Sequence, residues 1–185
     1  MASSTKEALG NALKKMLNIK PIDKITVKDL VEECGVNRQT FYYHFDSIPD
    51  LVEDIVSDIT KEIIENNASV RSLEECIEIG AKVAIENKKV LMNIYNSANR
   101  NVYEIYLMKA CQSVVEQYIE TVFGEDDVNS FDRGILVRFY KCECFGQIID
   151  WMNNSMSYDL SKELCRLCHL REGFAEEVAR RCRKN

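Results

Sequence analysis

Apolar side chains recur at helical rather than strand spacing along the chain. Near the N-terminus, Leu9, Leu13 and Leu17 fall on one face of a helix predicted over residues 5–19, because positions three and four apart share a helical face. Pro21 ends this helix, since proline cannot continue the backbone hydrogen-bond ladder. The same spacing returns in every later segment, so we predict an all-α fold.

Two short helices are expected to follow. Thr26 with Asp29 three residues later is typical of a capping box, in which the two residues satisfy each other's backbone amides. Gly35 suits the left-handed conformation that ends many helices. Asn37 then caps a second short helix over residues 38–45. Two short helices joined by a tight glycine-containing turn form the helix-turn-helix pattern of DNA-binding proteins.

The remainder of the chain is also predicted to be helical. Ser47 caps a fourth helix, and later apolar stripes indicate helices over residues 72–84, 90–95, 101–123, 131–152 and 160–183. We therefore predict a three-helix, helix-turn-helix DNA-binding domain over residues 1–46 and a helical-bundle domain over residues 47–185. This boundary is functional rather than physical, because the fourth helix is expected to pack on both parts.

The second short helix carries the candidate chemistry. Its aromatic run begins at Phe41 and ends at Phe45, and a small three-helix unit cannot bury five consecutive side chains. Phe41 and Phe45 therefore suit a core role, whereas the residues around them suit base edges and phosphates in a major groove. The predicted DNA-binding residues are Thr26, Lys28, Asn37, Arg38, Gln39, Thr40, Tyr42, Tyr43, His44 and Ser47.

Charge at first argues against DNA binding. The chain carries 24 Lys and Arg against 30 Asp and Glu, for a net charge of −6. The imbalance is uneven, because residues 1–45 carry a net +2 and residues 46–185 a net −8. The acidic total therefore locates where DNA should not bind, and the small surplus predicts few phosphate contacts.

The stretch from Thr26 to Phe45, followed by Leu51, resembles the TetR/AcrR family of transcriptional regulators. One position departs from the family pattern, since Ile48 stands where a basic residue often reaches a phosphate. Phe145-Gly146 and Trp151-Met152 resemble the C-terminal part of regulators akin to the dihydroxyacetone-kinase regulator. The resemblance implies a dimer built from the last two helices and an effector cavity within the others.

The implied sites map onto apolar residues of the C-terminal helices. Candidate effector-pocket residues are Met92, Tyr95, Tyr103, Tyr106 and Phe139, for which plain core packing is an equal alternative. Candidate dimer-interface residues are Phe145, Ile149, Met152, Leu164, Leu167 and Phe174, for which a monomer core is the alternative. A self-complementary pairing of two such helices from each subunit makes a four-helix interface.

These features predict a DNA-binding transcriptional regulator that partners with a near-palindromic double-stranded operator. We expect a repressor released by a small-molecule effector, with an activator or coactivator of the same fold as the alternative. A thiol- or metal-responsive regulator using Cys142, Cys144, Cys165 and Cys168 is a third possibility. No recognisable catalytic set assembles, so we expect neither an enzyme nor a cofactor. The N-terminal residues lack a signal-peptide core and no apolar run is long enough for a membrane span, so we expect a cytoplasmic protein.

Overall fold

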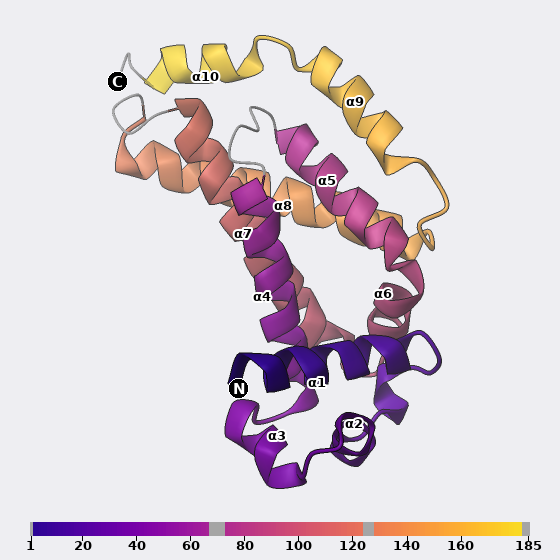
Figure 1. The fold of residues 1–185 in the computed structure, drawn as a ribbon. Coiled ribbons are helices and arrows are strands. Elements are labelled where there is room, and N and C mark those ends of the chain that lie inside the picture. The colour runs from indigo at the N-terminus through magenta and orange to yellow at the C-terminus, as the bar shows by residue number, and fades with distance from the viewer. Residues whose placement is uncertain (1, 67–72, 124–127, 183–185) are drawn as a thin grey trace. The chain divides into compact units, whose positions relative to one another are not determined.

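Helices make up the regular structure of this chain wherever it is described. The computed structural model describes residues 2–66, 73–123 and 128–182, and no strand occurs among them. The predicted start of one helix at Ser72 and the predicted end of another at Gly124 lie outside these residues. Figure 1 shows the elements in chain order: α1 Ala2–Leu17, the 3-10 turn η1 Ile22–Lys24, α2 Val27–Cys34, α3 Arg38–His44, α4 Ile48–Asn66, α5 Leu73–Glu86, α6 Lys88–Tyr95, α7 Arg100–Phe123, α8 Ser130–Asn153, α9 Leu160–Leu170 and α10 Phe174–Cys182. The predicted all-α fold is confirmed.

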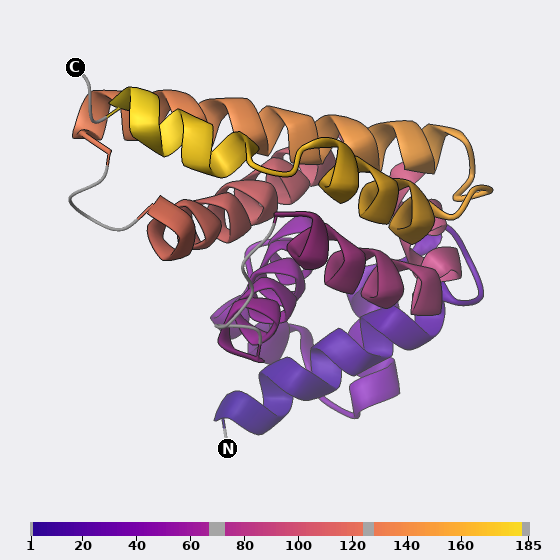
Figure 2. The ribbon, with the colours of Figure 1, turned by 90° about the horizontal axis from the view of Figure 1, so that it is seen from above.

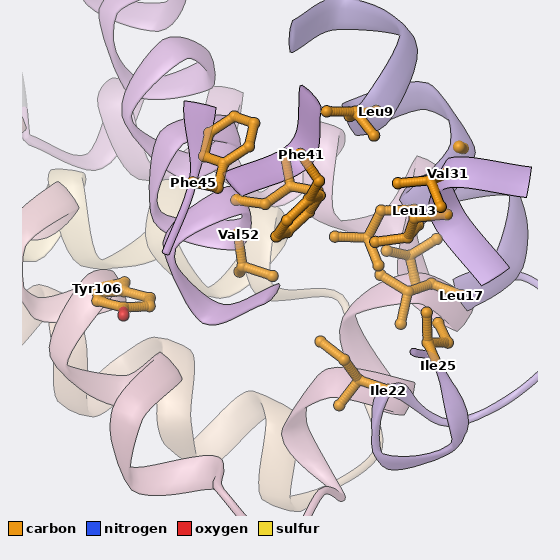
Figure 3. Packing of buried hydrophobic residues seen from close by; sticks show 14 residues of the cluster. Leu9, Leu13, Leu17, Ile22, Ile25, Val31, Phe41, Phe45, Val52 and Tyr106 are labelled. Carbon is orange, nitrogen blue, oxygen red and sulfur yellow. The ribbon is translucent and has the colours of Figure 1, made fainter. Parts of the chain in front are cut away.

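The first compact unit combines residues 1–59 with residues 87–106. Its core is a cluster of buried side chains drawn from α1, η1, α2, α3, α4, α6 and α7, and Figure 3 shows Phe41 in the middle of it. The members are Leu9, Ala12, Leu13, Leu17, Ile22, Ile25, Leu30, Val31, Phe41, Phe45, Leu51, Val52, Val90 and Tyr106. The cluster therefore joins the helix-turn-helix segment to residues more than forty positions further along the chain.

Two hydrogen bonds tie α6 and the start of α7 to the N-terminal helices. The Asn93 side-chain amide donates to the Leu17 carbonyl, at the C-terminal end of α1, over 2.7 Å. The Ala98 backbone amide donates to an Asp23 carboxylate oxygen in η1 over 2.9 Å. The first bond satisfies a carbonyl at a helix end, where the regular ladder leaves it without a partner, and the second satisfies an amide in the turn between α6 and α7.

The second compact unit combines residues 60–86 with residues 107–185. Its buried side chains include Val115, Ile119, Phe123, Tyr140, Trp151, Leu160 and Leu164. The rings of Tyr118 on α7 and Tyr140 on α8 meet edge to face with centroids 5.8 Å apart. α5 packs against α9, and Figure 2 shows that α9 and α10 follow each other in the direction opposite to that of α8. An ion pair of 3.0 Å between Glu143 and Arg171 joins α8 to the end of α9.

The predicted continuous helix over residues 160–183 is wrong. The structure has two helices there, α9 and α10, with Gly173 between them at a φ of +78°. Glycine reaches this left-handed conformation without strain, so it ends one helix and allows the chain to turn into the next. The predicted functional boundary at residue 46 stays a prediction, since the compact units divide the chain elsewhere.

Candidate nucleic-acid interface

The start of α2 is fixed by a reciprocal pair of side-chain bonds. The Asp29 amide donates to the Thr26 hydroxyl oxygen over 3.2 Å, and the Thr26 amide donates to an Asp29 carboxylate oxygen over 3.0 Å. The helix ends at Gly35, whose φ of +66° is left-handed and whose amide bonds back to the last turn. The predicted capping box and glycine stop are both confirmed, and together they define the short first helix of the motif.

Asn37 starts α3, as predicted. Its side-chain oxygen accepts from the Thr40 amide over 2.8 Å and from the Thr40 hydroxyl over 3.0 Å. Asn37 and Thr40 are thus bonded to each other in the free protein. The Thr40 side chain keeps its methyl group and its acceptor capacity, which are the features that suit a thymine methyl or a base donor.

The aromatic run of α3 separates into two faces. Phe41 and Phe45 are buried in the core of the first unit, and their rings lie 5.9 Å apart. Tyr42 and Tyr43 point outward, and Tyr43 is 81% exposed. His44 is half-buried, with its ring edge-on to Tyr43. The predicted small core is confirmed, and it anchors a helix whose outer face carries hydroxyl donors.

The other predicted contact residues of the motif also lie on the surface. Arg38 and Gln39 begin α3 and are exposed, and Lys28 in the first turn of α2 is exposed as well. The Asp50 amide donates to the Ser47 hydroxyl over 3.3 Å, so Ser47 caps α4 as predicted. The structure brings these side chains to the surface of one compact unit, and their contact with DNA stays a prediction.

In the N-terminal part of this unit, residues 1–45, four of the seven Lys and Arg side chains are engaged by carboxylates. Four ion pairs involve its lysines: Lys6 with Asp54 at 2.8 Å, Lys20 with Asp29 at 2.9 Å, Lys28 with Glu32 at 3.7 Å, and Lys15 with Glu33. The Lys20 ammonium, together with the Thr26 amide, holds the pKa of Asp29 below its ordinary value. Within the described residues, Lys14, Lys24 and Arg38 have no ion pair, which leaves few free cations for phosphate.

The predicted effector-pocket residues show mixed environments. Tyr95 and Tyr106 are buried, and Tyr106 belongs to the same core cluster as Phe41. Met92 and Tyr103 are half-buried, and burial together with the charge of Asp23 raises the pKa of Tyr103 to about 12. Phe139, on α8, is exposed. For Tyr106 this placement favours core packing, and the pocket as a whole stays a prediction.

The predicted dimer residues are similarly divided. Met152 and Leu164 are buried within the second unit, and Phe174 is exposed. Phe145, Ile149 and Leu167 are half-buried. Their role in a dimer interface is untested.

Sequence reasoning missed an exposed apolar stripe on α8. Phe131, Ile135 and Phe139 follow one another at four-residue intervals and all lie exposed. Ile135 also lines a cavity of about 210 Å³, together with Asp132, Leu136, Arg181 and Cys182. The four-residue spacing was visible in the sequence, but nearly every face of this helix carries apolar residues. The pattern alone therefore could not show which face is left uncovered.

The cysteines considered for a thiol or metal sensor lie in different environments. Cys142 and Cys165 are exposed, whereas Cys144 is buried, and the Cys168 side chain lies outside the described residues. Cys144 contacts Cys111 instead, and hydrogen bonding to that thiol together with burial raises the pKa of Cys144. Among the described residues, no three His, Cys, Asp or Glu side chains are placed to hold a metal ion. None of the described helices is long and apolar enough to cross a membrane.

Comparison with known proteins extends the resemblance across the chain. Residues 11–55 match the model of bacterial regulatory proteins of the tetR family, and residues 71–172 match the model of a transcriptional regulator C-terminal region. A solved structure, the dihydroxyacetone kinase operon activator DhaS, superposes with a TM-score of 0.69 over 93% of this chain and 96% of that chain. Its sequence identity is 16%, so the likeness is one of fold. No curated protein sequence matches.

Proposed function

Because the chain belongs to the TetR family of bacterial transcriptional regulators, we propose that it binds a near-palindromic operator as a homodimer and is released by a small-molecule effector. The observation that carries the DNA-binding part is the outer face of α3. A short helix is capped by Asn37, anchored by Phe41 and Phe45, and presents Tyr43 almost fully to solvent. Such a helix is the recognition element of a helix-turn-helix protein.

The side chains of α3 suit different parts of DNA. Arg38 suits the O6 and N7 acceptors of guanine, and Gln39 suits the N6 and N7 edge of adenine. Both begin the helix, where recognition helices contact base edges. Tyr42 and Tyr43 follow, and their hydroxyl groups suit phosphate oxygens. The first turn of α3 then determines the preference for a DNA sequence, and the phosphate contacts of the two tyrosines determine how the helix is positioned on the duplex.

A dimer is supported by the stripe of Phe131, Ile135 and Phe139 on α8. An apolar helix face left open in one copy of the chain becomes buried when a second copy pairs with it about a two-fold axis. A symmetric dimer places two recognition helices in successive major grooves, about 34 Å apart. An effector that prefers a different spacing of those helices would release DNA by shifting the population.

Activation is the second candidate for the sign of regulation. It is favoured by one observation, that the structurally similar protein DhaS is named an operon activator. Deleting the gene distinguishes the two signs, because loss of a repressor raises target transcription and loss of an activator lowers it. Transcripts of the genes beside the bound DNA are the quantity to measure.

The test of DNA binding combines mapping with matched variants. Genome-wide mapping of bound DNA identifies the operator, and the affinity of purified protein for that duplex is then measured. We expect Tyr43→Ala and Thr40→Ala to weaken operator binding about 5- to 150-fold, since losing a good hydrogen bond to a phosphate or a base costs about 1–3 kcal/mol. Lys109→Ala, an exposed change on α7, should leave the affinity unchanged. Equal effects from all three variants would contradict the proposed interface.

A further inference from the structure

The charges on α2 are arranged against the helix dipole. Lys28 lies in the first turn, where the free amides create a partial positive charge, and Glu32 and Glu33 lie in the last turn, where the carbonyls create a partial negative charge. No basic residue occupies the last turn. Of the charged residues of this helix, Asp29 alone has the favourable placement, and it is used in the capping box.

The ion pair between Lys28 and Glu32 contributes little to the stability of α2. Its two charged atoms are 3.7 Å apart, and the side chains are 63% and 65% exposed. Exposed pairs of this kind contribute about 0–1 kcal/mol, and lysine placed N-terminal to glutamate is the weaker order. Glu32 is therefore poorly explained by the stability of α2. Where a local rule is broken without compensation, a functional role is the usual reason.

The position of this pair in the motif suggests that role. In a helix-turn-helix protein the first helix crosses the DNA backbone, so Lys28 at the start of α2 is placed to meet a phosphate. Glu32 lies one turn further on and holds the Lys28 ammonium. Phosphate and Glu32 thus compete for one cation. Glu33 differs, because its carboxylate is engaged by Lys15 from α1.

We propose that Glu32 is a specificity-determining residue, which restrains Lys28 and repels phosphate so that sequence-independent binding to DNA stays weak. On an operator, the base contacts of α3 hold the duplex in place while Lys28 exchanges Glu32 for a phosphate. On other sequences those base contacts are missing, so Lys28 stays paired with Glu32 and the phosphate contact does not form. This inference rests on the proposed DNA-binding function.

The experiment measures binding to a short duplex of mixed sequence, and to an operator duplex selected from a random library, over a series of salt concentrations. Glu32→Gln should bind the mixed duplex several-fold more tightly than the wild type at low salt. The slope of log K against log salt should steepen by about 0.9, the value for one added phosphate contact. The ratio of operator to mixed-sequence affinity should fall. The double variant Lys28→Gln/Glu32→Gln should show no steeper slope than the wild type.

The matched control is Glu120→Gln, which removes the same charge from an exposed position on α7 in the second unit. It should leave both affinities unchanged. The melting temperature of Glu32→Gln should equal or exceed that of the wild type, because the replaced carboxylate opposes the helix dipole.

Three outcomes would overturn the inference. Glu32→Gln binding like Glu120→Gln, while the wild type binds its operator, would refute the role of Glu32 alone. A steeper slope that persists in the double variant would refute the role of Lys28. Absence of binding by the wild type to either duplex would refute the proposed function and the inference together.

Discussion

Two helices, α3 of the first unit and α8 of the second, leave different kinds of large side chain exposed. On α3 of the first unit these are Tyr42 and Tyr43, whereas on α8 of the second they are Phe131, Ile135 and Phe139. Tyrosine carries a hydroxyl that can meet a polar partner, and phenylalanine and isoleucine have only hydrocarbon to offer. The difference matches the two proposed partners, a polar nucleic acid for α3 and the apolar surface of a second copy of the chain for α8.

The largest expected effect contrasts a buried with an exposed aromatic residue of the same helix. Phe41 is completely buried in the core of the first unit, so Phe41→Ala should lower the free energy of unfolding by about 3–5 kcal/mol, through lost burial and the cavity left behind. Tyr43→Ala, two positions away and exposed, should change it by less than about 0.5 kcal/mol. Urea denaturation measures both. Similar losses would show that α3 is not divided into a core face and a free face.

The second prediction tests the partner of the α8 stripe. Phe139→Glu places a charge in an apolar surface, and if a second copy covers that surface the dimer should dissociate about 30-fold more readily, the effect of losing about 2 kcal/mol at an interface hot spot. Sedimentation over a range of protein concentrations measures the dissociation constant. Ile85→Glu, at an exposed position on α5, is the control. An equal response of the two variants would remove the stripe from the interface.

The sequence predicted the helix-turn-helix well because its signals are local. The capping box of Thr26 and Asp29, the left-handed Gly35 and the cap at Asn37 each depend on residues three or four positions apart. The same locality made Gly173 ambiguous, since a glycine inside an apolar stripe is compatible with either a weakened helix or a break. The helical periodicity continues across it, so the pattern favoured one helix where the structure has two.

Contacts between distant segments could not be predicted in this way. Tyr106 has the chemical character expected of a pocket residue, an apolar ring with a polar hydroxyl. It nevertheless joins the cluster around Phe41, because the start of α7 belongs to the first unit. The ion pairs of Lys6 with Asp54 and Lys15 with Glu33 likewise depend on how helices meet. The residue counts predict a net positive charge for the N-terminal segment. Only the structure shows how much of that charge is already paired with carboxylates.

The third prediction tests whether α6 is part of the first unit. Asn93→Ala removes the amide that bonds to the Leu17 carbonyl at the end of α1, so the free energy of unfolding should fall by about 1–2 kcal/mol. Hydrogen exchange should show faster opening of α1 and α6 together. Asn96→Ala, exposed at the C-terminal end of α6, is the matched control. Faster exchange confined to α6 would separate this helix from the N-terminal core.

The smallest expected effect is a pH dependence of stability that arises from Asp29 in the helix-turn-helix motif. The Lys20 ammonium and the Thr26 amide hold the pKa of Asp29 below its ordinary value of 3.8. A carboxylate with a depressed pKa stabilises the fold fully above its unfolded-state pKa, and this contribution is lost as the pH falls through the folded-state pKa. Asp29→Asn should therefore lower the urea midpoint at neutral pH.

The difference between Asp29→Asn and the wild type should begin to shrink below a pH of about 4 and be lost as the pH falls through the lowered folded-state pKa, where the wild-type carboxyl also becomes neutral. Urea midpoints measured at a series of pH values give the two curves. Glu177→Gln is the control from the other unit, because Arg180 and Arg181 lower the pKa of Glu177 to about 2 within a single helix. Its difference from the wild type should be lost only as the pH falls towards about 2. A constant difference for Asp29→Asn across the series would mean that this carboxylate acts only through its hydrogen bonds, and that its charge does not hold α2 against the end of α1.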